Sequence, residues 1–549
     1  MRDVSEGSAW ARIHQMLSFV SQILPGPLFE VNEMKGKPLS DTIKMRDFQA
    51  IILLSVSILC FVSSPTDGAI INSASCSQAA VQSAIDAAQN GDAVVIPAGS
   101  CTWNSPVSIS KGITIRGGGE NATVLDGNTD VFFKVNGTGG NFRLTGIGFQ
   151  GSASWAFITL DGTFTSLRVD HLQFSDVPGV RGIIVGYNSR DLSPIKGVFD
   201  HLTVSCSSWK IFLAQYGNNN AWLAPDDCGS DNAIYVEDST FTGTSGATLD
   251  VLDGECGARF VVRHNRITNG LISYHDTGST PQCRSTRIAE IYANEFSCTA
   301  SDCGWGAISF RGGTGVYFNN VIPQYPNGYE NGATTEIYRV SYPAGGRPWT
   351  HACDNVVDRV CSDFRSHCNG GDNRACAGDY DCPVGTCSVD VCEKDSECGG
   401  AATCLSTFDG QLDASGWPCR DQTGRGQDDP VTHAQASSPA YWWNNTDLSN
   451  NPMQVLVADA DANYIKPERD YYGYKANFNG TSGVGMGTRA MRPTSCTAGV
   501  GYWATDENKL YQCTVANTWS LYYTPYPYPH PLTGGATAFP SSPKNLRMR

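Results

Sequence analysis

A short pattern that recurs along the chain constrains the fold more than any other feature. Each copy has an apolar residue, two further residues, a fourth residue that is often Leu or Asn, one more residue and a second apolar residue. Successive copies lie 25 to 37 residues apart, at 144–149, 169–174, 199–204, 236–241, 262–267, 291–296 and 317–322. A period of this size is typical of a solenoid, in which each turn buries its inward side chains against the next turn.

The residues within these copies favour coiled parallel strands over stacked helices. β-branched runs are broken by Gly, Asn and Asp, and second short strands lie between the copies, for example 248–252 and 271–274. The 3.6-residue apolar periodicity that helical repeats need is missing. Three successive copies carry Asn265, Asn294 and Asn320 at their fourth position, and stacked amides can hydrogen-bond along a solenoid axis. The sequence therefore predicts an all-β protein with a parallel β-helix.

The first turn of such a coil is an open edge that has to be covered. Residues 77–90 form an amphipathic pattern that ends at Gly91, which predicts a capping helix. The strand 93–96 then begins the first turn, and a disulfide between Cys76 and Cys101 would join cap and turn.

Three stretches around this cap, 84–88, 91–99 and 113–117, resemble the right-handed parallel β-helix proteins of the pectate-lyase-like superfamily. Together with the repeats, the resemblance covers roughly residues 70–345. It implies a right-handed coil but no single activity, because this scaffold carries lyases, hydrolases, epimerases and non-enzymes. The Arg-x-Pro-x-x-Arg motif of pectate lyases and the Gly-His-Gly and Arg-Ile-Lys motifs of polygalacturonases are absent from the sequence.

The N-terminal region predicts export. The apolar run 48–62 follows Lys44 and Arg46 and is too short to span a membrane comfortably, which is typical of a signal peptide. We expect a signal peptide at 45–69, with residues 1–44 as a leader or a mis-assigned start, and a protein that is secreted or held at the cell surface. The net charge of −15 argues against nucleic acid or anionic lipid as the partner.

The cysteines support this location. The sequence has 21 cysteines, and 20 remain once Cys60 is removed with the signal peptide. An even number in an exported chain predicts up to ten disulfides, whereas the paired Cys-x-x-Cys spacing of zinc sites is absent. Residues 353–404 hold a tandem cysteine repeat that looks like those of some exported bacterial proteins. Its acidic residues either bind calcium or are solvated loop carboxylates: Asp379, Asp381, Asp395 and Glu397.

Residues 405–549 form an aromatic- and Pro-rich tail in which Cys496 and Cys513 are expected to staple a β-hairpin. Segments of the tail at 417–426, 441–445 and 523–532 look like those of an exported bacterial β-helix family without a settled activity. Trp442 and Trp443 either pack along the β-helix or stack on sugar rings.

Candidate chemistry comes from aligning the second strands of successive turns, which lie about 4.8 Å apart in a parallel sheet. This alignment brings ionisable residues to nearby heights: Asp250, Asp253, His275, Asp276, Arg311 and Arg339, with Arg287 and Glu290 from the strand between. We expect the catalytic groups among His275, Arg311, Asp276 and Asp253, and the other four residues in substrate binding.

Three interpretations of this cluster stay open. In a uronate lyase, Arg311 or Arg339 would neutralise the sugar carboxylate and His275 would be the base. In a glycoside hydrolase, Asp253 with Asp276, or Asp226 with Asp227, would supply the two carboxylates. In a non-catalytic surface or adhesion protein, these groups pair with one another. In each case the expected partner is a polysaccharide or cell-surface glycan, with calcium as the one candidate cofactor.

Overall fold

The computed structural model describes residues 68–175, 181–189, 194–207, 210–244, 249–274, 284–299, 303, 306–325, 335–337, 421–430, 435–457 and 465–534, and four short strands within 359–406. In this part of the chain, no helix has the length and apolar character needed to cross a membrane.

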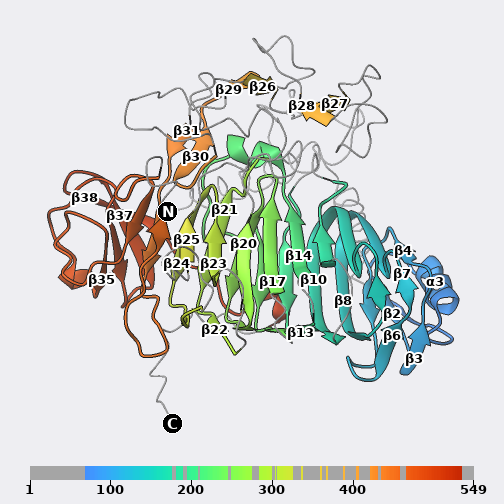
Figure 1. The fold of residues 1–549 in the computed structure, drawn as a ribbon. Coiled ribbons are helices and arrows are strands. Elements are labelled where there is room, and N and C mark those ends of the chain that lie inside the picture. The colour runs from blue at the N-terminus through green and yellow to red at the C-terminus, as the bar shows by residue number, and fades with distance from the viewer. Residues whose placement is uncertain are drawn as a thin grey trace, which may run out of the picture. The chain divides into compact units, whose positions relative to one another are not determined.

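The body is a parallel β-helix built from three ladders of strands, which we call A, B and C (Figure 1). Two long strands, β8 (Phe133–Phe149) and β10 (Ile158–Ser175), bend through all three ladders. Ladder A also contains β1 (Ile70–Asn72), β2 (Ala93–Val95), β5 (Thr114–Arg116), β12 (Gly197–Asp200), β15 (Ile234–Glu237), β18 (Arg259–Arg263), β21 (Ile288–Tyr292), β24 (Thr314–Phe318), β32 (Ala440–Trp443) and β34 (Tyr471–Gly473).

The other two ladders follow the same order along the chain. Ladder B contains β3 (Gly99–Thr102), β6 (Thr123–Asp126), β13 (Thr203–Cys206), β16 (Thr240–Gly243), β19 (Arg266–Thr268) and β22 (Glu295–Ser297). Ladder C contains β4 (Val107–Ile109), β11 (Arg181–Val185), β14 (Lys210–Tyr216), β17 (Leu249–Glu255), β20 (Gly270–Tyr274), β23 (Ile308–Phe310), β25 (Thr335–Ile337) and β33 (Leu456–Val457). The β-helix predicted from the repeat is therefore confirmed.

From β8 onward, each turn passes from ladder A to ladder B through one residue in the left-handed region, for example His201, Ala293 and Asn319. The residue after this corner points inward, and in four successive turns it is Asn. The Nδ2 of Asn265 donates to the Oδ1 of Asn294 (3.1 Å), and Asn294 donates to Asn320 in the same way (3.0 Å). Asn320 in turn donates to Asn445 (2.8 Å). The amide stack expected from the sequence is confirmed, and it is one turn longer than expected.

The first turn carries the predicted cap. Helix α3 (Gln78–Ala87) buries Val81, Ala84 and Ile85 against the first turns, and it lies beside β4 at the blue end of the ladders in Figure 1. Cys76 and Cys101 are joined by a disulfide, as expected. The short strand β1 precedes the cap and pairs with β2, so the coil begins one strand earlier than predicted.

The β-helix continues beyond residue 345, where the sequence placed its end. Strand β32 pairs in parallel with β24, and Asn445 extends the amide stack. Trp442 and Trp443 are 1% and 0% exposed. Of the two alternatives for these residues, packing along the β-helix therefore holds, and the substrate-binding role by sugar stacking is wrong for both. The chain leaves the coil after β25 and re-enters it at β32. Because the chain leaves the coil and returns to it, the spacing between repeats is not constant here. The repeat pattern therefore predicted an end of the β-helix that is too early in the sequence.

The cysteine-rich region between these strands contains two antiparallel strand pairs. They are β26 (Arg359–Cys361) with β29 (Cys404–Ser406), and β27 (Ser366–Cys368) with β28 (Cys387–Val389). The four acidic residues considered for calcium lie outside the described residues, so that prediction stays open. Among the described residues, no group of three or more His, Cys, Asp or Glu side chains is arranged to hold a metal ion.

Smaller elements flank the ladders. Strands β7 (Asn128–Thr129) and β9 (Ser152–Ala153) pair in parallel, and β30 (Arg425–Asp428) pairs antiparallel with β31 (Gln435–Ser437). Three 3₁₀ turns occur, η3 (Asn219–Leu223), η8 (Arg489–Met491) and η9 (Pro531–Thr533), within the described ranges.

The C-terminal region folds as a four-stranded sheet of β35 (Val484–Gly487), β36 (Gly501–Ala504), β37 (Lys509–Val515) and β38 (Thr518–Tyr523). Its β36–β37 hairpin is stapled by Cys496 and Cys513, as expected. One face of this sheet packs on the outer side of ladder A, where Trp503 lies 5.1 Å from Trp443 between ring centroids.

A third disulfide joins Cys298 and Cys303. Cys228, in contrast, is a free thiol. The prediction of up to ten disulfides therefore does not extend to this residue, which lies partly buried beside the Arg287 and Glu290 side chains.

Replacing Asn320 by Ala should destabilise the β-helix by about 2–4 kcal/mol, because several buried partners in the amide stack lose a hydrogen bond together. Urea denaturation followed by circular dichroism measures this change. Asn319→Ala is the matched control, since its equivalent one turn earlier is already Ala293, and it should cost about 1 kcal/mol or less. Equal losses for the two variants would contradict a structural role for the stack.

Candidate functional site

A β-bulge in ladder C places three carboxylates on the outer side of one strand. The register between β17 and β20 shifts between Asp250 and Asp253, so β17 has one more residue than its neighbour over this interval. Val251 and Leu252 both lie in the core, and Asp250 and Asp253 therefore both face outward. Normal alternation then puts Glu255 on the same side.

These carboxylates are shielded from solvent, with exposed fractions of 3% for Asp250, 2% for Asp253 and 8% for Glu255. Asp250 accepts hydrogen bonds from the Ser273 hydroxyl (2.5 Å) and from the Ser273 backbone N–H (3.3 Å). Asp253 and Glu255 are two residues apart on one strand, so their Cα atoms are separated by about 7 Å.

A tyrosine lies directly beside this group. Tyr216 on β14 is the register partner of Glu255, and Ala214 is the partner of Asp253. Burial raises the pKa of Tyr216, and the negative charges of Glu255 and Asp253 raise it further, while Arg181 acts in the opposite direction. The phenol therefore keeps its proton throughout the physiological range.

An aromatic stripe of Trp155, Tyr187 and Tyr216 continues from here along the outer side of ladder C. The ring centroids of Tyr216 and Tyr187 are 5.0 Å apart, and those of Tyr187 and Trp155 are 5.3 Å apart. The guanidinium of Arg181 lies 4.8 Å from the Trp155 ring. Trp155 and Tyr187 are half-buried, so part of each ring remains accessible.

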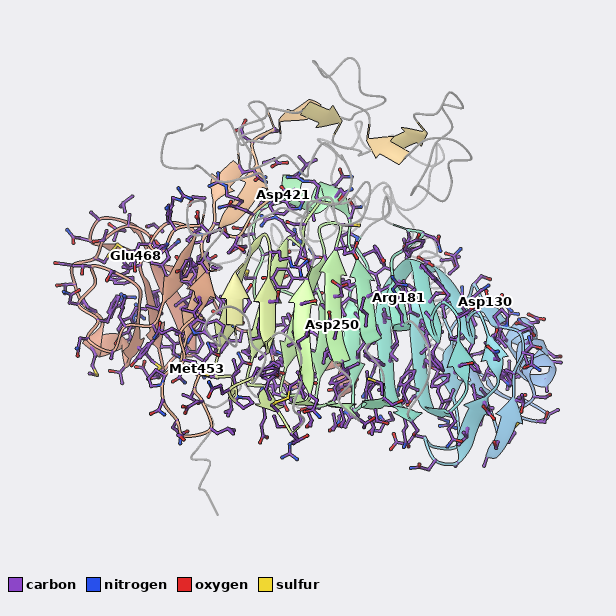
Figure 2. The ribbon with its side chains drawn as sticks, in the orientation of Figure 1. Asp130, Arg181, Asp250, Asp421, Met453 and Glu468 are labelled. Carbon is purple, nitrogen blue, oxygen red and sulfur yellow. A yellow bond between two sulfur atoms is a disulfide. The ribbon has the colours of Figure 1, made fainter. Side chains whose placement is uncertain are left out.

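The stripe ends in an open groove of about 640 Å³ over the first turns of ladder C. Lys134 and Asp130 form an exposed ion pair at the groove (2.8 Å), and Asp161 accepts hydrogen bonds from Asn188. Figure 2 labels Asp130, Arg181 and Asp250 along this row of strands. Groove, stripe and carboxylates thus follow one another along the ladder.

The structure brings together only some of the residues that the sequence analysis grouped. Asp250 and Asp253 share the outer side of β17, and Arg311 follows β23, which pairs with β20 through Ser273 and Ser309. His275, Asp276 and Arg339 lie outside the described residues, so their roles remain predictions.

Arg287 and Glu290 do not belong to this group. Both lie at ladder A, where Arg287 pairs with Asp226 and Glu290 accepts hydrogen bonds from the Gly229 N–H (2.6 Å) and the Tyr523 hydroxyl (2.7 Å). The C-terminal region covers this side of the coil, so the substrate-binding role expected for the two residues is wrong.

The alternative carboxylate pair, Asp226 with Asp227, is also engaged elsewhere. Asp226 binds Arg287 and Asp227 binds Arg259. Both arginines are buried, and removing either carboxylate would leave a buried charge without its partner. These ion pairs hold the segment containing η3 against the coil.

Glu255, Tyr216, Arg181 and the aromatic stripe were not predicted from the sequence. Glu255 was not recognised because the strand was predicted to end at Leu252. Extending this strand by three residues would have found Glu255. The stripe was not recognised because its three aromatic residues do not occupy the same position in their respective turns.

Comparisons with known proteins give no assignment. No protein-family profile matches the sequence, and no curated protein matches it significantly. Among solved structures, the chain is similar to an alginate lyase from Paenibacillus sp. str. FPU-7, with 15% identity over 49% of this chain and 97% of that one, and a TM-score of 0.25. This match is too weak to carry an argument about function, and membership of the pectate-lyase-like superfamily remains a prediction.

Glu290 gives a testable pH dependence of stability. Burial outweighs its hydrogen bonds and raises its pKa from 4.5 to about 7. The folded state thus holds this proton more tightly than the unfolded chain. The protonated Glu290 therefore adds its full contribution to the free energy of unfolding below pH 4.5, and this contribution is lost as the pH rises to about 7. We expect stability to fall by about 3 kcal/mol over this window through Glu290 alone.

Glu290→Gln should flatten this part of the stability curve, measured by urea denaturation at a series of pH values. Glu295→Gln, at an exposed site of ladder B, is the control and should leave the slope unchanged. An unchanged slope in Glu290→Gln would show that Glu290 is ionised in the folded protein at neutral pH.

Proposed function

We propose that the protein is an exported, carbohydrate-active β-helix that binds an elongated polysaccharide along the outer side of ladder C and cleaves it beside β17. The observation that carries this proposal is the bulge, which sets Asp250, Asp253 and Glu255 on one side of a strand next to Tyr216. The disulfides support a location outside the cytoplasm.

The groove and the aromatic stripe are the proposed binding surface for the polysaccharide. Successive strands repeat about every 4.8 Å, which is close to the length of one sugar unit, so a linear glycan can follow the ladder. Trp155 and Tyr187 offer ring faces for the apolar sides of sugars. Lys134, Asp130 and Asn188 offer polar groups to hydroxyls.

Hydrolysis is the chemistry that the carboxylates favour. A glycosidase needs one protonated carboxyl group to donate to the leaving oxygen and one carboxylate to attack or to activate water. Shielding from solvent helps one carboxyl group of such a pair to keep its proton. Asp253 and Glu255 are the proposed pair, and Tyr216 stands beside Glu255 as a further hydrogen-bond donor.

Elimination is the second candidate, and the pairing of a cation with a protonated phenol favours it. Arg181 would neutralise the carboxylate of a uronosyl unit, and Tyr216 would donate a proton to the leaving oxygen. The base would be His275 and a second cation would come from Arg311 or Arg339, as proposed from the sequence. The three carboxylates oppose this mode, because they repel an anionic sugar.

The deciding experiment incubates the protein with uronate-containing and neutral polysaccharides while new reducing ends and unsaturated uronates are followed together. We expect reducing ends without ultraviolet absorbance. Glu255→Gln and Asp253→Asn should each lower turnover by about a hundredfold or more. Glu295→Gln is the control for an exposed carboxylate and should keep full activity.

Rising absorbance would instead establish elimination and direct mutagenesis to Arg181, Tyr216 and His275. Absence of both products, with glycan binding retained, would support the non-catalytic surface or adhesion protein. Activity that survives in both carboxylate variants would place the reaction away from β17.

A further inference from the structure

The C-terminal sheet carries a second pocket, and the residues that line it are far in sequence from those that line the groove of ladder C. It is an open hollow of about 780 Å³ between η8 and the β37–β38 turn. The hollow is lined by two arginines, Arg489 and Arg492, by the indole of Trp519 and by the exposed polar residues Thr494, Asn517 and Thr518. A half-buried indole beside cations and small polar groups is a suitable surface for a charged sugar.

Arg492 is held in place by aromatic rings. Its guanidinium carbon lies 4.4 Å from the Tyr511 ring centroid and 5.2 Å from that of Trp519. The Trp519 indole N–H donates to the Pro493 carbonyl (2.8 Å), which fixes the orientation of the indole. A guanidinium fixed in this way loses little conformational entropy when it binds an anion.

Two carboxylates, Asp506 and Glu507, also line the pocket, and both are already engaged. Glu507 accepts from Arg489 (2.9 Å) and from the Tyr511 hydroxyl (2.5 Å), and Asp506 accepts from the Arg489 backbone N–H (2.8 Å). The Nη1 of Arg492, in contrast, is buried without a hydrogen-bond partner among the described residues. Burial and the repulsion from Arg489 lower the pKa of Arg492, so an anion here would relieve an unfavourable charge.

We propose that this pocket is a second glycan-binding site that takes an acidic sugar, with the sugar carboxylate on Arg492 and the ring against Trp519. Arg492 supplies a planar pair of donors that fits a carboxylate, and Thr494, Asn517 and Thr518 are placed for ring hydroxyls. The site is an anchoring site, distinct from the proposed cleavage site, and it does not depend on catalysis at ladder C.

Hydrogen–deuterium exchange on the full chain tests the site by location. The probe is a uronic-acid trisaccharide, compared with the same trisaccharide after reduction of its carboxyl groups and with a sulfated neutral trisaccharide. We expect the uronate to protect the amides of residues 489–495 and 517–520. The carboxyl-reduced sugar should give no protection there.

Isothermal titration calorimetry on variants measures how much individual side chains contribute to uronate binding at this pocket. Arg492→Gln should weaken uronate binding at this site by about tenfold to a hundredfold, and Arg492→Lys should recover only part of the loss, because an ammonium group lacks the planar donor pair. Arg266→Gln, an exposed arginine on ladder B, is the control. Thermal unfolding checks that each variant is folded.

Protection confined to ladder C, or equal protection by the uronate and its reduced form, would overturn the proposal. Protection by the sulfated sugar alone would overturn the carboxylate assignment. Because the readout is local, loss of activity in Glu255→Gln with protection at 489–495 intact separates this site from the proposed cleavage site.

Discussion

The register between successive turns governs how the whole coil packs. A parallel coil works only if every inward side chain meets its equivalent in the next turn, and a slip of one residue would turn core residues outward. The amide stack from Asn265 to Asn445 helps to fix this register. Each amide is shared between two turns, so a slipped turn would leave buried polar groups without partners.

Once the register is fixed, the outward rows of the ladders are free to differ. The outer side of ladder A carries aromatic residues such as Tyr292, Phe318 and Trp443, and the C-terminal region covers them. Its buried polar groups are satisfied from that region, as Arg263 donates to the Tyr526 and Pro527 carbonyls. The outer side of ladder C instead keeps an open groove. The outer side of ladder A is thus covered and stabilises the coil, whereas the outer side of ladder C is open and suited to binding.

The predicted cluster separated because a β-helix has more than one outer side. Residues at the same position along the solenoid axis can lie on different ladders and face different sides of the coil. The alignment of repeats predicted only the position along the axis. Asp250 lies in the turn of β15 to β17 and Glu290 lies two turns later, in the turn of β21 to β23, and the two residues belong to different ladders. The bulge in β17 had the opposite effect, because it brought Asp250 and Asp253 onto one side although simple alternation would separate them.

The coil, the cap, two disulfides and most of the amide stack could be predicted from the residues alone, because each depends on local periodicity or on residues within about one turn of one another. Contacts between distant parts of the chain, in contrast, bury Trp442 and Trp443 and cover Glu290. A local bulge that the sequence pattern does not show sets which carboxylates share a side of β17. The re-entry of the chain at β32 and the packing of the C-terminal sheet on ladder A join residues more than a hundred positions apart. Such contacts leave no periodic signal in one sequence.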